Sequence, residues 1–259
     1  MKVEQENIAD EKAIRGIAKS YNPLSYTTEL IDLLKSVYPT QNFEEWCKYY
    51  LHQAVNDLLI AKYNDEKLLK YELFSLHSQK ELVGAFEMKV KSSRVDSLTI
   101  NGCTTSFEIK SALDNLTKLN KQSNDYIKAF DFNYLVVDDR HIENALALVP
   151  ESFGIWTFNS GRKKIYRKAE ANGHIDAEVQ LSLLTKKELA ANFSEVEGCL
   201  KAITRNFSHQ SINKRFKNAL KNRYKQRWNF LVTHQQSILP VDIQFFFKTC
   251  LQPSQVYYH

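Results

Sequence analysis

The first third of the chain has the hydrophobic spacing of helices. In "SYTTELIDLLKSVY" (25–38) and "FEEWCKYYLHQAVNDLLIAKY" (43–63), apolar residues recur every three or four positions. This spacing places them on one face of a helix. Pro23 and Pro39 stand before and between these runs, where proline separates helices. We therefore predict a helical N-terminal segment over residues 1–80.

The pattern changes at Gly84 to short runs rich in β-branched and aromatic residues. These runs are "GAFEMKV", "RVDSLTI", "TSFEIKS", "NYLVV" and "FGIWTF". They are typical of strands, and helical stretches near 114–130 and 141–148 interrupt them. Residues 81–170 are therefore predicted to form an α/β core.

Residues 171–259 return to helical spacing and become basic. No acid occurs between Glu197 and Asp242, an interval that contains nine Lys and Arg residues. Four lysines repeat at helical spacing opposite an apolar face of Ile212, Phe216, Ala219 and Leu220; they are Lys214, Lys217, Lys221 and Lys225. The same ridge suits a solvated helix face or a surface that binds phosphate groups.

Composition narrows the class of protein. With 259 residues, 43% apolar and 25% charged, the chain is large enough for a substantial core. The charged N-terminus and the lack of a long apolar run predict a cytoplasmic protein with no membrane segment. The four cysteines form no CxxC pair and the seven histidines show no zinc-ligand spacing, so we expect neither disulfides nor structural zinc.

The first candidate functional residues lie in the strand-like run "TSFEIKS". Alternate residues of a strand share a face, so Glu108 and Lys110 point one way while Phe107 and Ile109 point into a core. A second Glu-x-Lys occurs at Glu87 and Lys89, and either pair alone is compatible with ordinary solvated strand polarity.

The preceding strand adds Asp96, joined to the Glu108 strand by "INGC". A two-residue Asn-Gly turn would send the Asp96 and Glu108 carboxylates to opposite faces. We therefore predict a three-residue connection, Asn101 to Cys103, that pairs Ile100 with Thr104, or else a bulge with the same effect. Asp96 would then oppose Glu108, and paired carboxylates suit Mg²⁺ or Mn²⁺.

The following helix carries Lys118, Gln122 and Tyr126 at intervals of four. This ridge flanks an apolar stripe and is predicted to lie beside the acids. There it could bind phosphate or position the lysine. A helix with a half-buried Gln and Tyr explains the same pattern without a site.

Together these motifs resemble the PD-(D/E)XK nuclease superfamily, whose fold is restriction-endonuclease-like. The likeness covers roughly residues 87–158 and is strongest to a bacterial branch with RxD, EIKS and QxxxY motifs. In this sequence the motifs are Arg94-x-Asp96, Glu108-Ile109-Lys110-Ser111 and Gln122-x-x-x-Tyr126. Lys118 stands where arginine is commoner in that branch.

The resemblance implies an α/β fold with a mixed central sheet flanked by helices. It also implies a metal-dependent phosphodiester hydrolase acting on nucleic acid, with DNA favoured over RNA. Asp96, Glu108 and the backbone carbonyl of Ile109 would bind Mg²⁺ or Mn²⁺, and Lys110 would assist the attacking water. Glu87 matches an extra upstream acid that some members use.

Two other classes stay open from the residues. One is a nucleic-acid-binding module on a nuclease-like fold without activity, although retention of Asp96, Glu108 and Lys110 together argues against it. The other is an interaction protein whose basic face meets an acidic partner.

Overall fold

The computed structural model describes residues 11–63, 66–78, 81–112, 114–159, 162–196 and 200–258. The chain divides into two compact units. Unit 1 comprises Met1–Tyr71 and Phe230–His259, and unit 2 comprises Glu72–Asn229. Helices α4 (Glu66–Ser78) and α10 (His209–His234) contribute residues to both units.

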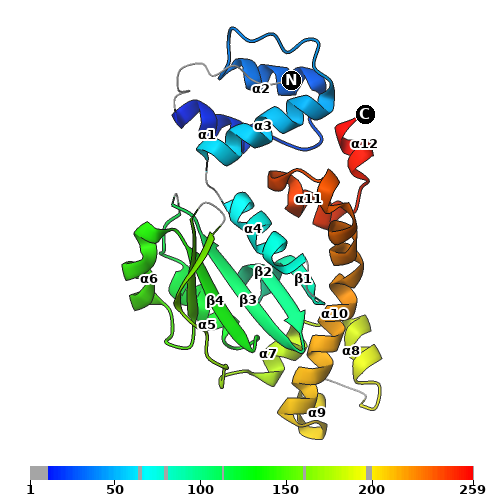
Figure 1. The fold of residues 1–259 in the computed structure, drawn as a ribbon. Coiled ribbons are helices and arrows are strands. Elements are labelled where there is room, and N and C mark those ends of the chain that lie inside the picture. Colours follow the sequence, from blue (N-terminus) through cyan, green and yellow to red (C-terminus); the bar gives the residue numbers. More distant parts are fainter. Residues whose placement is uncertain are drawn as a thin grey trace. The chain divides into compact units, whose positions relative to one another are not determined.

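Unit 2 is an α/β structure built on one six-stranded sheet in the order β1-β2-β3-β4-β5-β6 (Figure 1). Strands β3, β4 and β5 are mutually parallel, and the other neighbours are antiparallel. The sheet is therefore mixed, as the sequence pattern predicts. The strands are β1 (Val83–Val90), β2 (Ser93–Asn101), β3 (Cys103–Lys110), β4 (Phe132–Val137), β5 (Gly154–Asn159) and β6 (Arg162–Arg167).

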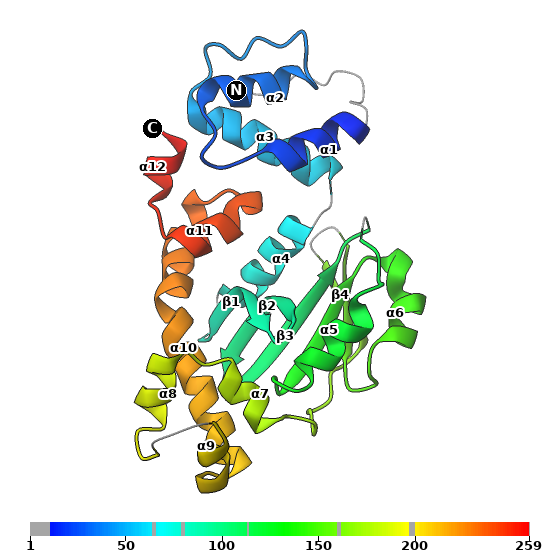
Figure 2. The same ribbon diagram turned by 180° about the vertical axis from the view of Figure 1, so that it is seen from behind.

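Helices cover both faces of this sheet (Figures 1 and 2). On one face, His77 of α4 lies against Phe107, and Trp228 of α10 packs on Phe74. Gly84 is required beneath Trp228, because a Cβ atom there would lie 2.3 Å from the indole ring. The other face receives α5 (Leu119–Tyr126).

Shorter helices complete unit 2. They are the 3₁₀ turn η1 (Asp139–His141), α6 (Ile142–Leu148), α7 (Ala177–Ser182), α8 (Lys186–Asn192) and α9 (Leu200–Asn206). Thr185 and Glu188 form a capping box at the start of α8, which satisfies amides that the first helical turn leaves unpaired. Arg223 of α10 pairs with Glu188, so α8 is attached to α10.

The β2–β3 hairpin has the register that the sequence argument predicts. Ile100 pairs with Thr104 and Asn101 with Cys103, leaving Gly102 at the tip with φ +69°. The three-residue connection is confirmed. The β2–β3 ladder ends with Ser97 paired to Phe107, so Asp96 and Glu108 are the next residues of the two strands.

Two expectations from the sequence need correction. Helix α5 begins at Leu119 with Lys118 as its N-cap, so the helix is shorter than the predicted stretch of 114–130. The basic strand β6 was not predicted, because its sequence RKKIYR lacks the alternation of a half-buried strand. It is an edge strand, where lysines are favoured because they discourage pairing with another chain.

Unit 1 is helical, as predicted for the N-terminal segment. Its elements are α1 (Glu11–Ser20), α2 (Thr27–Lys35), α3 (Lys48–Lys62), η2 (Gln235–Ser237), η3 (Pro240–Asp242), α11 (Ile243–Thr249) and α12 (Pro253–Tyr257). Apolar residues of α1, α2 and α3 form its core together with Val241. No helix in the described ranges combines the length and the apolar character needed to cross a bilayer.

A buried polar network joins the two chain segments of unit 1. Tyr21 Oη lies 2.9 Å from His52 Nδ1 and 3.0 Å from Asp242 Oδ2. Tyr257 Oη donates to the same Asp242 oxygen at 2.8 Å, and Val241 N donates to Asn56 Oδ1 at 3.0 Å. Residues 185 and 221 positions apart in sequence are thereby held by hydrogen bonds inside one core.

Burial shifts the pKa values of Asp242 and His52, two ionisable members of this network, in the directions that favour their neutral forms. Desolvation raises the pKa of Asp242 to about 6, despite hydrogen bonds from Tyr257 and Tyr21 that lower it. Desolvation lowers the pKa of His52 to about 4, with a smaller contribution from Lys48. Both directions follow from the cost of burying a charge.

These shifts predict opposing pH dependences. An acid with a raised folded pKa contributes stability that is lost as pH rises from about 4 to about 6, whereas the depressed His52 contributes stability that grows over the same range. Each contribution is at most about 3 kcal/mol, since one pKa unit corresponds to about 1.4 kcal/mol. The wild type should therefore show a weak net slope from this pair.

Single substitutions should separate the two contributions. In Asp242→Asn, the stability of unit 1 should rise with pH between 4 and 6.5; in His52→Gln, it should fall. Amide hydrogen exchange in α3, corrected for intrinsic exchange and measured on the full chain, reports this stability. Parallel pH profiles for both variants would contradict the assignment.

Candidate active site

The site predicted from sequence forms where β3 ends and α5 packs on the sheet. Glu108 is 1% exposed. Lys110 Nζ lies 2.5 Å from Glu108 Oε1, and Gln122 Nε2 donates to the same oxygen. Tyr126 Oη lies 2.6 Å from Glu108 Oε2 and 2.7 Å from the carbonyl oxygen of Arg94. Four of the five predicted catalytic residues therefore meet at one carboxylate.

Asp96 joins the same region through the backbone. Its Oδ2 accepts a 2.7 Å hydrogen bond from the amide of Ile109. The β2–β3 ladder ends at Ser97 and Phe107, so beyond that point the Asp96 carboxylate takes the place of a backbone acceptor for the Ile109 amide. Asp96 thus lies beside the residue that separates Glu108 from Lys110.

Glu87 lies on the other side of Asp96. A carboxylate oxygen of Glu87 and one of Asp96 are within 4.8 Å of one another. Arg94 Nη1 pairs with Glu87 Oε2 at 3.3 Å. Glu87 has φ +58° inside β1, a conformation that L side chains adopt at a cost of about 1–3 kcal/mol. Strained backbone of this kind is concentrated at functional sites.

The electrostatics keep the proton on Lys110 and on Tyr126. Burial acts to lower the pKa of Lys110, but the Glu108 carboxylate and, more weakly, Asp96 and Asp114 raise the pKa above its usual value. Burial and then Glu108 raise the pKa of Tyr126. Lys110 is therefore an ammonium at neutral pH and loses its proton only when the pH rises through the raised lysine pKa.

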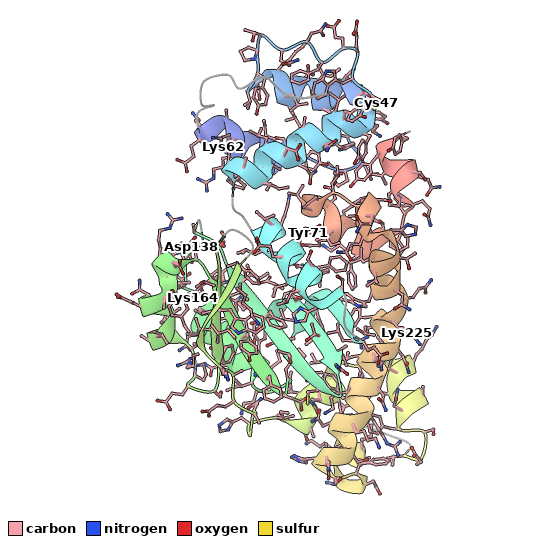
Figure 3. The ribbon with its side chains drawn as sticks, viewed as in Figure 1. Cys47, Lys62, Tyr71, Asp138, Lys164 and Lys225 are labelled. Atoms are coloured by element: carbon pink, nitrogen blue, oxygen red, sulfur yellow. The ribbon has the colours of Figure 1, made fainter. Side chains whose placement is uncertain are left out.

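The remaining predicted residues fall outside this cluster. Lys118 is exposed at the N-cap of α5. On α10, the predicted apolar face is confirmed, since Ile212, Phe216, Ala219 and Leu220 are all buried. Lys214, Lys221 and Lys225 are exposed, and Lys225 is labelled on α10 in Figure 3.

Lys217 has a structural partner. Its Nζ lies 3.4 Å from Asp131 Oδ2, and both side chains are largely buried. Asp131 also accepts hydrogen bonds from Asn213 Nδ2 and from the amide and hydroxyl of Thr104. Although burial acts to raise it, these contacts hold the pKa of Asp131 below its usual value. Lys217 thus attaches α10 to the start of β3.

Two further groups of hydrogen bonds hold the segments around the predicted site. Ser92 and Ser93 donate to Asp125 Oδ2 at 3.2 and 2.6 Å, which attaches the β1–β2 turn to α5. Asp114 accepts from both the amide and the hydroxyl of Ser111, each at 2.7 Å. The Ser111-x-x-Asp114 spacing is the sequence signal for such a turn.

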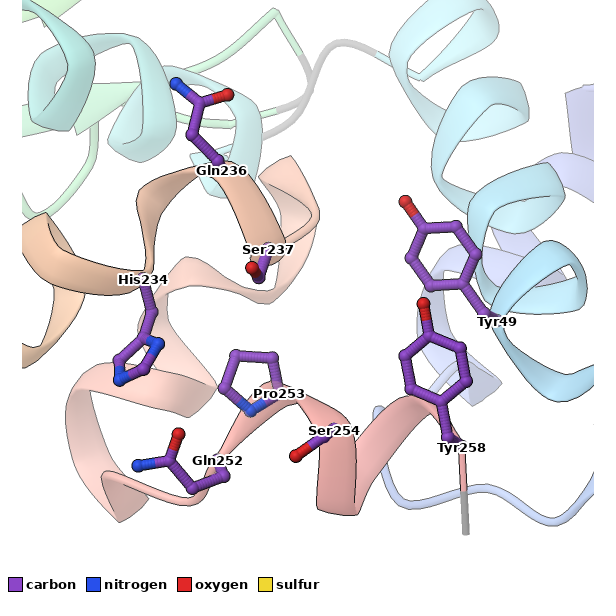
Figure 4. Close-up of a pocket in the computed structure, with 8 residues that line it drawn as sticks. All are labelled: Tyr49, His234, Gln236, Ser237, Gln252, Pro253, Ser254 and Tyr258. Carbon is purple, nitrogen blue, oxygen red and sulfur yellow. The ribbon is translucent and has the colours of Figure 1, made fainter.

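A separate pocket of about 290 Å³ lies within unit 1. Figure 4 shows its lining of aromatic, amide and hydroxyl side chains: Tyr49, His234, Gln236, Ser237, Gln252, Pro253, Ser254 and Tyr258. The rings of Tyr49 and Tyr258 stack at 5.5 Å. This set contains no carboxylate, so it does not suit a hard cation.

Fold and site together define an α/β protein with a buried carboxylate–lysine cluster beside one helix. Residues 61–246, more than two thirds of the chain, match the family described as Bacteriophage P4 protein cII. The chain belongs to that family. No curated protein matches the sequence.

One solved structure is similar to part of the chain. It is described as SPO1766, a protein of unknown function from Silicibacter pomeroyi, and is 18% identical with a TM-score of 0.34. The alignment covers 50% of this chain and 92% of that one. Neither description names a reaction or a ligand.

The contacts of Tyr126 predict a measurable role in stability. Tyr126→Phe removes a donor from the buried Glu108 carboxylate, and leaving a buried charged acceptor short of a partner costs about 1–3 kcal/mol or more. Denaturant unfolding of unit 2 should show that loss. Tyr166→Phe is the matched control, because Tyr166 is exposed and surface changes stay within about 0.5 kcal/mol. Equal losses in the two variants would contradict the network.

Proposed function

We propose that this protein is a metal-dependent nuclease that hydrolyses phosphodiester bonds in nucleic acid, with DNA as the favoured substrate. The observation that carries the proposal is the convergence of Lys110, Gln122 and Tyr126 on Glu108, with Asp96 on the neighbouring amide. The resemblance of this motif set to PD-(D/E)XK nucleases supplies the reaction. The mixed sheet flanked by helices is compatible with it.

The residues present suit a hard divalent cation. Mg²⁺ and Mn²⁺ prefer oxygen ligands, and Asp96, Glu108 and Glu87 supply carboxylates. Gln122 Oε1 is buried and has no hydrogen-bond partner among the described residues. This amide oxygen can therefore accept a hydrogen bond from a bound water or coordinate the cation itself. Asp96, Glu108 and the Ile109 carbonyl would hold the ion, and Glu87 is an additional candidate.

A bound cation would neutralise the acids and lower the pKa of a coordinated water. The side chains have distinct parts in this proposal. Because Lys110 is an ammonium, we assign it the stabilisation of negative charge on the phosphate and not the acceptance of a proton. Tyr126 and Gln122 orient the Glu108 carboxylate, and the Ile109 amide orients that of Asp96.

Alanine substitution tests the chemistry. Asp96→Ala and Glu108→Ala should each reduce cleavage of supercoiled or linear DNA by about a hundredfold or more, since even partners of metal ligands cost about 10–100-fold when removed. Lys110→Ala should reduce it by about 10²-fold or more, as for loss of one charge-stabilising group. Cleavage should require Mg²⁺ or Mn²⁺ and stop with chelator.

The matched control is Lys89→Ala, which alters the second Glu-x-Lys motif at an exposed lysine of β1. It should retain activity, and circular dichroism should show that all variants fold. Metal-dependent cleavage that persists in Glu108→Ala would contradict the assignment of Glu108 as a metal ligand. DNA binding without cleavage in either metal would favour the inactive binding module, and binding that any acidic polymer displaces would favour the interaction protein.

A further inference from the structure

The unpredicted strand β6 places cationic and aromatic side chains near the carboxyl ends of the parallel strands, where the candidate site lies. Strands β3, β4 and β5 are parallel, so their carboxyl ends meet at one edge, where α/β proteins commonly bind ligands. Lys110 is the last residue of β3. Because β6 is antiparallel to β5, it begins at this edge.

The strand register gives the number of strands between Lys164 and the candidate site. Ile109, Val136, Trp156 and Ile165 form one row across four strands. The next row toward the edge starts at Lys110 and ends at Lys164. Three strand spacings of about 4.8 Å put Lys164 about 14 Å from Lys110, within reach of one bound nucleic-acid strand.

Lys164 also shares the face of the candidate site. Lys110 pairs with Val137 and Thr157 pairs with Lys164, and partners in a ladder lie on the same side of the sheet. The opposite side carries Phe107 and Trp156 in contact with each other. Figure 3 labels Lys164 and Asp138, the residue that follows β4.

Tyr166 and, in the segment after β4, Arg140 complete the group, which we call the edge row: Arg140, Lys164 and Tyr166. The Lys164 ammonium lies 4.4 Å from the ring centroid of Tyr166, and that ring is 39% exposed. Tyr166 Oη donates to Asp139 Oδ1 at 3.3 Å. Arg140 lies in η1, three residues after the end of β4; its side chain is 69% exposed and contacts Asp138 through Nε at 3.0 Å.

This combination distinguishes the edge row from α10. The edge row combines two exposed cations with an exposed aromatic ring, and single-stranded nucleic acids are bound by this combination of phosphate-binding cations and base-stacking aromatics. On α10 the lysines occupy a helix face, and Lys217 is engaged by Asp131. The acids near the edge row, Asp138 and Asp139, already accept from Arg140 and Tyr166.

We propose that the edge row binds the backbone and a base of the nucleic-acid strand that enters the candidate active site. The proposal rests on the proposed nuclease function for the identity of the ligand. Arg140 and Lys164 contact phosphates, and Tyr166 stacks on a base. The protective use of lysine on an edge strand is the competing explanation.

The test is direct binding of the full chain to labelled single-stranded DNA in chelator, so that cleavage plays no part. Arg140→Gln/Lys164→Gln should weaken binding about tenfold near 0.1 M salt and reduce the salt slope by about 1.4, at about 0.7 per phosphate contact. Tyr166→Leu should weaken binding about fivefold or more, as expected for loss of one stacked base.

The matched control is Lys186→Gln/Lys187→Gln, which removes two exposed charges from α8 and should leave binding within about twofold. Lys221→Gln/Lys225→Gln tests the rival surface. Equal losses in the edge-row variant and the α8 control, or a loss confined to the α10 variant, would overturn the proposal. So would displacement of DNA by polyglutamate at equal charge concentration.

Cleavage assays separate this proposal from the proposed function. If wild type cleaves DNA and the edge-row variant cleaves it with an unchanged KM, the edge row is wrong and the nuclease stands. If wild type never cleaves but the edge-row variant loses binding, the surface stands and the chemistry fails. If wild type does not bind DNA at low salt, both fail.

Discussion

The structure of unit 2 depends on the burial of one carboxylate. Glu108 is 1% exposed, and a buried carboxylate is tolerated only when it is paired and hydrogen-bonded. Lys110 supplies the charge from the same strand, while Gln122 and Tyr126 supply donors from α5. Helix α5 has only eight residues, so its position on the sheet is set as much by this carboxylate as by its apolar contacts.

Much of this arrangement can be predicted from local patterns. Five of the six strands follow from runs of β-branched and aromatic residues, and the hairpin register follows from requiring Asp96 and Glu108 on one face. The sequence does not reveal β6, because an exposed edge strand needs no apolar alternation. Nor does it locate Lys118, since the Asn- and Ser-rich sequence around α5 gives no strong helix start.

Local sequence pattern does not predict contacts between residues that are far apart in the chain. Lys217 looks like the other lysines of its ridge, and only the fold brings Asp131 beside it. The network of Tyr21 and Asp242 links residues 221 positions apart, and neither residue has a neighbour in sequence that predicts the pairing. Sequence periodicity identifies which face is buried, whereas the polar contacts within a core depend on topology.

Unit 1 is discontinuous along the chain, and this has a consequence for the order of folding. During synthesis, every residue of unit 2 emerges before Phe230 does, so the sheet and the Glu108 cluster can form while unit 1 still lacks its second segment. Until then Tyr21 has no Asp242 to donate to, and Asn56 has no Val241 amide to accept from. Helices α1 to α3 therefore cannot complete their core until the C-terminal segment has been synthesised. Until then, the polar groups that this core buries stay in contact with water.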